Sequence, residues 1–600
     1  MIYVADFETI TDPTDCRIWA WGMESLEEDS EFQYGNRMSE YIQVLKDLNK
    51  RNSNTIYFHN LKFDGEFIIH WLLTHGYTHT TEKKLQPNFF KTLISDMGQW
   101  YCIEIRFGDS KYTTRILDSL KVIPFSVEEI AQSFKLPISK LKIDYEEYRE
   151  PDHILTDDEV EYLKHDVQIM KLTMNRLISL GFDRMTAGSN ALHNYMGMCS
   201  NFDRWFPKLS EFEDTFVRRS YKGGWTYCNP SFRDKKIGKG IVLDVNSLYP
   251  SRMKYEILPY GEGEYYEGRY VKKKSRPLYV QRLRCSFDIK RGKLPTIQLK
   301  HTFGYSGTEY LTTTNGDIVE LTLTNVDLEL FLDHYKVEHL EYIDGFSYRG
   351  AKGMFNEYID YWMDVKVEAE KEGDFALRTI AKLMLNSLYG KFAKRPKGKS
   401  KYPYLDEEEK VAFRLGEEEE QGSLYIPVGT FITAYARNYT IRSAQKCKSR
   451  FLYADTDSLH LKGTKIPEYL HVDPYELGAW KHESTFKRAK YLGSKCYLEC
   501  IETTEEKLKA ELEKKPENAP LLNFKNKTRT TITCAGLPAY LHPAITYDNF
   551  AYQMNIYGKL TPKHVKGGIV LEKITFTLKE RSIDTKKKKC YNKNKERGLP

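Results

Sequence analysis

The sequence predicts a multidomain protein that joins an α/β domain to a larger α+β region. The chain has 600 residues and is 41% hydrophobic, which is enough to fill several separate cores. Residues 1–182 alternate short apolar strands with helical patterns, which is typical of an α/β unit. The later part combines apolar strands that carry aspartate with long helices and a strand-rich stretch, which indicates α+β folding.

Composition favours a globular protein that works inside the cell. The ten cysteines include no Cys-x-x-Cys pair, so reduced thiols are expected instead of a zinc ribbon or a disulfide scaffold. No apolar stretch approaches the length of a membrane span. Met1 leads directly into a strand, Ile2-Tyr3-Val4, without a signal-peptide pattern. We therefore expect a cytoplasmic protein with no membrane segment.

The net charge of +6 is concentrated at one end of the chain. Residues 579–600 hold nine Lys or Arg and three acidic residues, so the remainder is balanced. Affinity of the body for nucleic acid must then come from local basic patches and from the aromatic residues, which make up 14% of the chain. The basic tail has too few apolar residues to fold alone, and its role stays open.

Acidic residues near the N-terminus have the spacing of metal ligands. Asp6 and Glu8 lie two residues apart in the first strand, so both point to one face of it. In residues 57–65 a strand runs into a turn, which places Asp64 at the start of a predicted helix. A buried acid needs a partner, and a metal ion is one. For Asp64, a role as the helix N-cap is the open alternative.

A helix from about Asp157 to Leu180 carries a further acid. The capping box Thr156-x-x-Glu159 opens this helix and Gly181 closes it. Tyr162 and Asp166 are four residues apart and therefore share a face.

A second set of carboxylates lies far along the chain. Asp455 and Asp457 follow an apolar run and precede an alternating one, which predicts a β-hairpin with both acids at its tip. Asp244 ends the apolar run of residues 241–245. Three such acids would form the all-oxygen site that Mg²⁺ prefers when substrate phosphates complete its ligands. Ordinary turn chemistry is the alternative for the Asp-x-Asp pair alone.

A helical segment from about Phe375 to Lys391 separates these two acidic segments. Arg378, Lys382, Asn386 and Tyr389 fall within a stripe of about 80° on this helix, opposite an apolar face. The stripe suits a triphosphate and a sugar, and a solvated basic face is the alternative.

Taken together, the three segments resemble motifs A, B and C of family B DNA polymerases. The motifs are residues 244–250, 382–390 and 453–458, in the family's order. The chain is most similar to the protein-primed polymerases of small tailed bacteriophages, from Met1 to about Leu578. The resemblance implies an N-terminal RNase H-like 3′-5′ exonuclease domain and a right-hand polymerase with palm, fingers, thumb and two insertions.

The resemblance also implies roles for individual residues of the exonuclease. Asp6, Glu8, Asp64 and Asp166 would hold two metal ions, and Tyr162 would orient the attacking water. Lys140 aligns with a lysine that assists this site, although a solvated surface lysine is the alternative. The residues implied in binding DNA at the two sites are His59, Asn60, Phe63, Ser119, Leu120, Tyr221, Gly223, Gly224, Lys495 and Tyr497. Asn60 and Phe63 also suit an ordinary turn and core, and the glycines a hairpin loop.

In the polymerase, the resemblance makes Asp244 and Asp457 the metal-binding catalytic acids, with Asp455 as support. Tyr249 would exclude a ribose 2′-hydroxyl by collision. The implied nucleotide-binding residues are Val245, Tyr249, Lys366, Arg378, Lys382, Asn386 and Tyr389. The chain departs from the family pattern in two ways, because Arg378 replaces the usual lysine and extra residues separate Lys366 from Lys382. Lys495 and Tyr497 are expected on one strand, facing the primer together.

We expect the chain to divide into eight segments. They are the exonuclease domain 1–182, first palm part 183–255, insertion 256–349 that contacts the priming protein, fingers 350–392, second insertion 393–425, second palm part 426–530, thumb 531–578 and basic tail 579–600. Within them, residues 183–209 read as a linker, residues 391–404 as an irregular basic loop that closes over DNA, and residues 503–520 as a charged helical excursion.

The predicted function is DNA-templated DNA synthesis with proofreading, primed by a separate terminal protein. Two Mg²⁺ ions per active site are expected, with Mn²⁺ as a substitute. The expected partners are primer-template DNA, dNTPs and the terminal protein, for a monomer in the cytoplasm of an infected bacterium. Processive synthesis with strand displacement is expected from the second insertion. A nuclease with a degenerate polymerase half and a non-catalytic nucleic-acid-binding replication factor are the alternatives, and the intact carboxylate sets argue against both.

Overall fold

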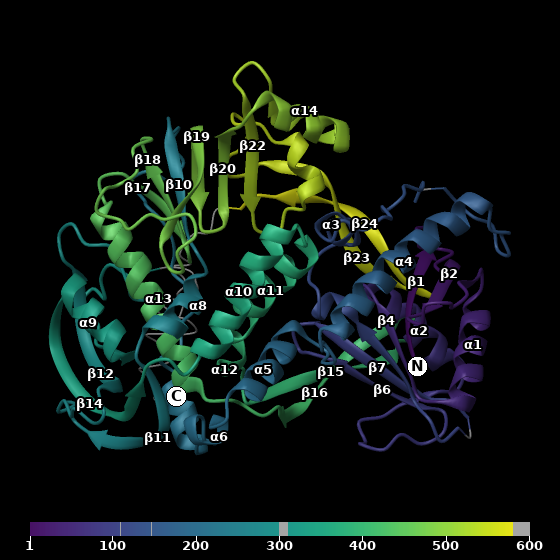
Figure 1. The fold of residues 1–600 in the computed structure, drawn as a ribbon, viewed down its shortest axis with the longest axis horizontal. Coiled ribbons are helices and arrows are strands. Elements are labelled where there is room, and N and C mark those ends of the chain that lie inside the picture. The colour runs from purple at the N-terminus through teal and green to yellow at the C-terminus, as the bar shows by residue number, and fades with distance from the viewer. Residues whose placement is uncertain (109, 146, 299–309, 580–600) are drawn as a thin grey trace. The chain divides into compact units, whose positions relative to one another are not determined.

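The computed structural model describes residues 1–108, 110–145, 147–298 and 310–579 (Figure 1). The chain packs as two compact units, each built from segments far apart in the sequence. The first unit comprises Met1–Ser200, Glu357–Ser423 and Leu560–Glu572. The second comprises Asn201–Asn356, Leu424–Lys559 and, among the described residues, Lys573–Lys579.

A mixed sheet forms the centre of the first unit, in the strand order β3-β2-β1-β4-β8-β7-β6-β5. Strands β1, β4 and β8 run parallel to one another, the pairs β1–β2, β2–β3, β8–β7 and β7–β6 are antiparallel, and β5 pairs with β6 in parallel. The strands are β1 (Ile2–Thr9), β2 (Ile18–Ser25), β3 (Gln33–Gly35), β4 (Asn54–Phe58), β5 (Thr78–His79), β6 (Phe89–Ile94), β7 (Trp100–Arg106) and β8 (Thr114–Asp118). The helices of this part are α1 (Met38–Arg51), α2 (Leu61–Thr74), α3 (Val127–Ser133), α4 (Asp157–Ser179) and α5 (Ala187–Met198).

Strand β1 has one apolar face and one acidic face. Tyr3, Ala5 and Phe7 are buried in the main core of the unit, together with residues of α1 and α2. Asp6 and Glu8 therefore point to the other side of the sheet, where α4 packs on β1 and β2. Helix α4 begins with the predicted capping box, in which Thr156 and Glu159 bond each other's backbone N–H groups. Gly181, beyond the end of this helix, has φ +83°.

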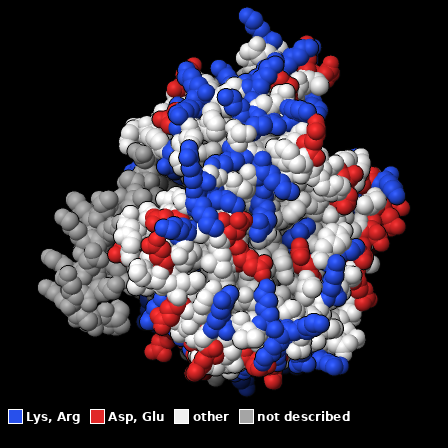
Figure 2. All heavy atoms as spheres, turned by 90° about the vertical axis from the view of Figure 1, so that its left-hand side faces the viewer, with Lys and Arg blue, Asp and Glu red and all other residues white. Residues whose placement is uncertain are grey.

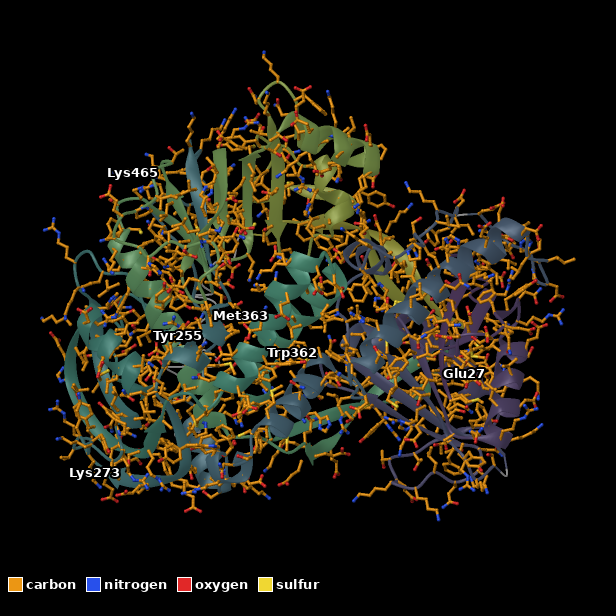
Figure 3. All side chains as sticks on the ribbon, in the orientation of Figure 1. Glu27, Tyr255, Lys273, Trp362, Met363 and Lys465 are labelled. Carbon is orange, nitrogen blue, oxygen red and sulfur yellow. The ribbon has the colours of Figure 1, made fainter. Side chains whose placement is uncertain are left out.

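The remaining parts of the first unit are helical and hairpin segments. Helix α10 (Asn356–Glu372) is followed by α11 (Phe375–Ser387) and α12 (Tyr389–Phe392), as the motif B pattern predicts. Figure 3 labels Trp362 on α10, whose indole N–H donates to the side-chain oxygen of Asn194 on α5 at 2.9 Å. The boundary between the two units, at Ser200 and Asn201, falls within the predicted linker of residues 183–209, but this linker is helical, because α5 and α6 (Phe202–Trp205) occupy it. The many polar and glycine residues of this stretch made the buried face of α5 hard to recognise in the sequence.

The predicted irregular basic loop over residues 391–404 is also wrong. Its second half is strand β15 (Lys397–Leu405), which pairs with β16 (Val411–Glu420). Lys397 lies opposite Glu420, and Lys399 opposite Glu418. Opposite charges across the two strands stabilise the hairpin in place of an apolar pattern. Charge, a glycine and a proline therefore concealed the strand in the sequence.

A second hairpin reaches the first unit from the C-terminal part of the chain. It is formed by β23 (Asn555–Val565) and β24 (Gly568–Thr577), and its tip is Leu560–Glu572. Val565 and Ile569 belong to the same buried cluster as the core of α1 and α2. Gly567 has φ +97°, and a Cβ there would collide with the carbonyl oxygen of Cys16. The hairpin tip is therefore an integral part of the first unit's core.

In the second unit, a sheet with the strand order β21-β22-β20-β19-β10-β18-β17-β9 carries the second set of acids. The strands are β9 (Thr226–Cys228), β10 (Gly240–Val245), β17 (Phe451–Asp455), β18 (Ser458–Lys462), β19 (Trp480–Gly493), β20 (Cys496–Glu502), β21 (Leu522–Asn523) and β22 (Thr528–Cys534). Its helices are α7 (Glu211–Arg218), α8 (Leu248–Tyr255), α13 (Ile426–Lys446) and α14 (Glu505–Lys514). Helix α14 confirms the charged helical excursion predicted over residues 503–520.

The stretch predicted as the first insertion has its own small sheet, in the order β11-β14-β12-β13. Its elements are β11 (Leu258–Glu267), β12 (Leu278–Ile289), β13 (Val319–Thr324), α9 (Asn325–His334) and β14 (Tyr335–Ala351). Asn315 and Gly316 form a turn in this stretch, with φ values of +51° and +82°. Residues 299–309 lie outside the described residues, as does the basic tail from residue 580.

None of the helices in the described part of the chain has both the length and the apolar character needed to cross a membrane. Figure 2 shows Lys and Arg side chains over much of one face, with Asp and Glu side chains among them. This mixture agrees with the charge balance of the body of the chain.

Candidate active sites

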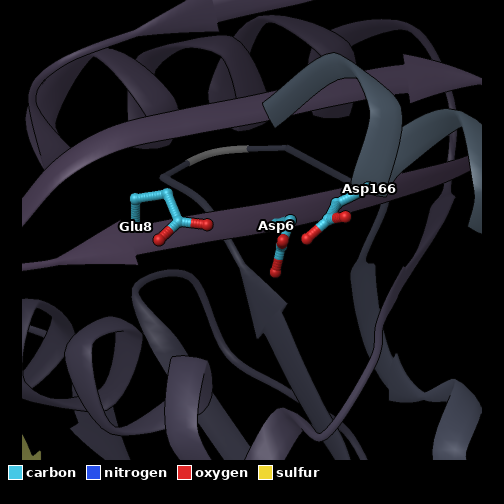
Figure 4. Close-up of side chains that lie close together, drawn as sticks. All are labelled: Asp6, Glu8 and Asp166. Atoms are coloured by element: carbon cyan, nitrogen blue, oxygen red, sulfur yellow. The ribbon is translucent and has the colours of Figure 1, made fainter. Parts of the chain in front are cut away.

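Three carboxylates in the first unit converge on one point. Asp6 and Glu8 come from β1 and Asp166 from α4, and one oxygen of each lies within 4.8 Å of the others (Figure 4). Glu8 and Asp166 are 7% and 3% exposed, so water does not screen their charges well. The alternation along β1 and the i, i+4 pattern of α4 therefore bring together the acids that they predicted.

Asp64 joins this cluster electrostatically, but it does not cap a helix. The N-cap of α2 is Asn60, which has φ +75°, and Asp64 lies within the first turn of the helix. The alternative interpretation of Asp64 as an N-cap is wrong. Burial raises the pKa of Asp64, and the negative charge of Asp6 raises it further.

The cluster has the electrostatics of an anionic site that suits a divalent cation. Burial, with the nearby charge of Asp166, raises the pKa of Asp6 to about 7. Burial, with the charge of Asp6, raises the pKa of Glu8 well above its ordinary value. One carboxylate oxygen of Asp166 is buried without a hydrogen-bond partner among the described residues. Buried acids of like charge with unused oxygens fit a hard cation such as Mg²⁺.

Lys140 and Tyr162 both face these acids. The ammonium group of Lys140 forms an ion pair with Asp166 and lies 5.4 Å from the centre of the Tyr162 ring. Burial lowers the pKa of Lys140, but the charge and hydrogen bond of Asp166, together with Tyr145 and the charge of Asp6, outweigh this effect, so the net shift of the pKa is upward. The interpretation of Lys140 as a solvated surface lysine is therefore wrong. Burial and the charge of Glu8 raise the pKa of Tyr162, so its hydroxyl remains a donor.

Tyr145 is a member of this site that the sequence did not indicate. Its hydroxyl lies 2.6 Å from the hydroxyl of Tyr162. Tyr145 comes from an irregular segment, so no periodicity placed it near α4.

The residues expected to bind DNA at this site lie around Asp118, which the sequence analysis also missed. The Asp118 carboxylate accepts hydrogen bonds from the backbone N–H groups of Asn60, at 3.0 Å, and Leu120, at 3.1 Å. Nδ1 of His59 lies 2.9 Å from the Ser119 hydroxyl. Phe63 packs against the core of the unit. An acid at the end of a buried strand was the available signal for Asp118.

In the second unit, β10 and the β17–β18 hairpin bring the strand that carries Asp244 beside the turn that carries Asp457. Asp244 lies opposite Ser458 in the antiparallel register of β10 and β18. The backbone N–H of Val245 donates to the carbonyl oxygen of Asp457 at 2.8 Å. Thr456, between the two acids of the hairpin, has φ +61°. The predicted hairpin with acids at its tip is confirmed, and its all-oxygen donor set fits a hard divalent cation.

The carboxylate of Asp455 is already engaged by protein groups. It pairs with the ammonium of Lys495 at 2.7 Å and accepts from the hydroxyls of Thr226, at 3.1 Å, and Tyr453, at 3.2 Å. Lys495 itself precedes strand β20 and has φ +56°. The prediction that Lys495 and Tyr497 extend from one strand is therefore wrong. Lys495 is itself a turn residue with a left-handed backbone, and its side chain pairs with Asp455.

The segment from Tyr221 to Gly224 connects α7 to β9, so the hairpin-loop alternative is wrong. A Cβ at Gly224 would lie 2.6 Å from Cγ2 of Thr456, whereas Gly223 has open space around it. The buried Arg437 on α13 donates to the carbonyl oxygens of Lys222, at 2.5 Å, and Gly223, at 2.9 Å. An arginine within an otherwise apolar helix was the signal for this anchor.

The motif B helix has the two faces that its periodicity predicted. Lys382 and Asn386 are exposed, whereas Ile380, Met384 and Leu388 are buried. Arg378 forms an ion pair with Glu370 at 3.3 Å. The other expected nucleotide-binding residues lie on α10 (Lys366), at the start of α12 (Tyr389), at the end of β10 (Val245) and on α8 (Tyr249).

Comparisons with known proteins identify the family. A sequence model described as DNA polymerase type B, organellar and viral, matches residues 46–156 and 142–474. The DNA polymerase of Bacillus phage phi29 is 44% identical over 586 residues, which cover 96% of this chain and 99% of that protein. The DNA polymerase of Streptococcus phage Cp-1 is 31% identical over 599 residues, covering 96% and 98%.

A solved structure of phi29 DNA polymerase, complexed with primer-template DNA and incoming nucleotide substrates, has a TM-score of 0.88 and 43% identity. It is matched over 96% of this chain and 100% of that chain. The predicted fold class, an exonuclease domain with palm, fingers and thumb, is confirmed by this match. The chain therefore belongs to the organellar and viral type B DNA polymerases, among the protein-primed enzymes of bacteriophages.

Proposed function

We propose that this DNA polymerase with 3′-5′ exonuclease activity synthesises DNA at the acids of the second unit and proofreads at those of the first. The observation that carries the proposal is that acids gather in both compact units. The carboxylates of Asp6, Glu8 and Asp166 converge in the first unit, and in the second the backbone N–H of Val245, next to Asp244, donates to the carbonyl oxygen of Asp457. Enzymes of this family depend on divalent metal ions, and we assign two per site, Mg²⁺ or Mn²⁺. When bound, such ions lower the pKa of an attacking hydroxyl or water and neutralise phosphate charge.

For synthesis, Asp244 and Asp457 are the metal ligands. Asp455 supports them without binding a metal ion directly, because its carboxylate is paired with Lys495. Lys495 and Tyr497 hold the primer end, and Tyr249 at the start of α8 excludes a ribose 2′-hydroxyl. Val245, Lys366, Arg378, Lys382, Asn386 and Tyr389 bind the incoming nucleotide. The phi29 enzyme has been solved with primer-template DNA and nucleotides, which supports both kinds of partner.

For proofreading, Asp6, Glu8, Asp64 and Asp166 are the metal ligands. Tyr162 orients the attacking water, and its bond to Tyr145 fixes the position of its hydroxyl. Lys140 balances the charge of Asp166. His59, Asn60, Phe63, Ser119 and Leu120 hold the frayed primer end, while Tyr221, Gly223 and Gly224 guide the template.

The phage relatives support a role in genome replication within an infected bacterial cell, which we assign to its cytoplasm. We assign a monomer that starts synthesis on the hydroxyl of a separate terminal protein, contacted by the sheet of residues 256–349. The β15–β16 hairpin closes over DNA and favours processive synthesis with strand displacement.

Extension of a labelled primer on a gapped template, with Mg²⁺ and all four dNTPs, tests this division of labour. Asp457→Ala is expected to abolish extension while still degrading single strands, because its exonuclease acids are intact. Asp6→Ala is expected to extend primers and to lose degradation.

A wild-type protein that only degrades primers at every dNTP concentration would contradict the polymerase assignment and leave a nuclease. Loss of both activities in either variant would contradict two independent sites.

A further inference from the structure

A buried polar network lies behind the polymerase hairpin and serves none of the roles assigned above. It consists of Glu499 on β20, His460 on β18 and Tyr491 on β19, which we call the Glu499 network. All three side chains are 3% exposed or less. An ionisable side chain in such a place is costly unless it is hydrogen-bonded, so its presence calls for a reason.

The Glu499 network is closely bonded. Oε1 of Glu499 accepts the hydroxyl of Tyr491 at 2.6 Å and lies 2.6 Å from Nδ1 of His460. This geometry places a proton on Nδ1 of His460. Burial and the charge of Glu499 raise the pKa of Tyr491 well above its ordinary value, so this hydroxyl remains a donor.

The network contacts two tyrosines that lead toward the polymerase site. The ring of Tyr453 lies 5.1 Å from that of His460 and 5.8 Å from that of Tyr491. The ring of Tyr497 lies 5.1 Å from that of His460. His460 and Tyr453 face each other in the register of β17 and β18. These rings fill one buried cluster, in which a shift of one side chain must displace the others.

Tyr453 connects this cluster to the primer side of the site. Its hydroxyl accepts the backbone N–H of Lys495 at 2.9 Å and donates to Asp455 at 3.2 Å. The side chain of Lys495 also forms an ion pair with Asp455, so Tyr453, Asp455 and Lys495 each contact the other two. The positions of Asp455, Lys495 and Tyr497 therefore all depend on the ring that the Glu499 network holds.

We propose that Glu499 is a positioning residue for DNA synthesis, acting through His460 and Tyr491 on Tyr453 and Tyr497, and so on the groups that hold the primer end. The inference rests on the proposed function, in which Lys495 and Tyr497 contact the primer. It predicts a defect in primer-template binding that leaves the exonuclease unchanged, since the exonuclease acids belong to the other unit.

The test compares steady-state primer extension by Glu499→Leu and Glu499→Gln. The leucine removes the acceptor and leaves two buried donors unpaired, so KM for primer-template is expected to rise about 10-fold, with KM for dNTP within about twofold. The glutamine keeps a carbonyl oxygen that accepts both donors, so it is expected to restore KM to within about twofold. Degradation of single-stranded DNA is expected to stay at the wild-type rate in both variants.

Gln281→Leu is the matched control. Gln281 is also fully buried, and its amide donates to three carbonyl oxygens in the separate sheet of β11 to β14. Its loss is expected to lower Tm by a similar amount without raising KM for primer-template. If Glu499→Leu does not fold, Tyr491→Phe removes a single hydroxyl at nearly constant volume and is expected to raise KM about threefold.

Wild-type KM in Glu499→Leu, or an equal rise of KM in Gln281→Leu, would overturn the proposal. Lys495→Ala separates this failure from that of the proposed primer site. If Lys495→Ala raises KM while Glu499→Leu does not, only the positioning role fails. If neither variant changes KM, the assignment of the primer site fails as well, and the proposal with it.

Discussion

Lys140 forms an ion pair with Asp166, one of the acids that we assign to the exonuclease, and its role can be tested by one substitution. Lys140→Met keeps the length of the side chain but leaves Asp166 without its ion pair among the buried carboxylates. We expect exonuclease activity to fall about 10- to 100-fold, as is typical when a group that supports metal ligands is lost. Degradation of labelled single-stranded DNA measures this effect, and primer extension is expected to be unchanged.

Lys142→Met is the control, because Lys142 is exposed and only two residues away. An equal loss of activity in this variant would show that general charge, and not the ion pair with Asp166, matters. The contrast is informative because the sequence offers both lysines in a single basic run.

For single residues, the sequence predicted which side chains meet in the site only where their spacing follows the period of a strand or a helix. Asp6 and Glu8 followed from the alternation of a strand, and Tyr162 and Asp166 from the turn of a helix. Tyr145 was missed because it lies in an irregular segment. Asp118 was missed because its carboxylate accepts a hydrogen bond from the backbone N–H of Asn60, which lies on a distant part of the chain. Side-chain contacts between loops follow no period that a sequence displays.

Among the elements, the turn between the two acids of the β17–β18 hairpin depends on a glycine from another segment. A Cβ at Gly224 would lie 2.6 Å from Cγ2 of Thr456, which no ordinary packing allows. Gly224→Ala is therefore expected to push the turn that carries Asp457 and to lower primer extension about 10-fold or more. Exonuclease activity, which we assign to the acids of the other unit, is the internal reference.

Gly223→Ala is the matched control, since a Cβ there meets nothing within 4 Å. A double substitution with Thr456→Gly removes the colliding side chain at a position that already has φ +61°, and it is expected to recover part of the extension activity. Equal defects in Gly223→Ala and Gly224→Ala would instead point to loss of flexibility along the whole segment.

Elements were predictable where local chemistry marked their ends. The capping box of α4 and the acidic tip of the β17–β18 hairpin were both confirmed. The β15–β16 hairpin and helix α5 were not predicted, because their stabilising contacts are cross-strand charge pairs and packing against distant segments.

For the molecule as a whole, pH acts on the attachment of the β23–β24 hairpin tip to the first unit. His564 on this tip lies 3.5 Å from Glu66, which is 1% exposed. The nearby Glu66 carboxylate raises the pKa of His564, and burial raises the pKa of Glu66. Both groups hold their protons more tightly in the folded state, so their contributions to stability decrease as pH rises.

We therefore expect the contribution of this pair to the free energy of unfolding of the metal-free protein to decrease between pH 6 and pH 8, as the pH passes the ordinary histidine pKa of 6.5 and the raised pKa of His564. Urea denaturation in the presence of a chelator measures the slope, to which Asp6, with its pKa of about 7, contributes with the same sign. Glu66→Gln removes the contribution of the pair and is expected to flatten the slope, whereas Glu31→Gln, at an exposed site, is not. A slope unchanged by Glu66→Gln would exclude the pair as its source.

The division into two compact units was beyond reach of the sequence. The eight predicted segments follow motifs along the chain, whereas the units collect segments by their apolar contacts in space. Val565 and Ile569, for example, complete the core of β1, α1 and α2 although they lie in the C-terminal part of the chain. A local apolar pattern predicts that a segment is buried, but it does not predict which distant segments it will pack against.

This assembly from separated segments has a consequence during synthesis on the ribosome. The hairpin tip is translated about 360 residues after Ser200, which at roughly 5–20 residues per second means a delay of about 20–70 seconds. Throughout that interval the nascent exonuclease core lacks Val565, Ile569 and Val570 and exposes the apolar surface that they later cover. Chaperone binding and aggregation of the unfinished chain should therefore concentrate on the first 200 residues until the last hairpin emerges.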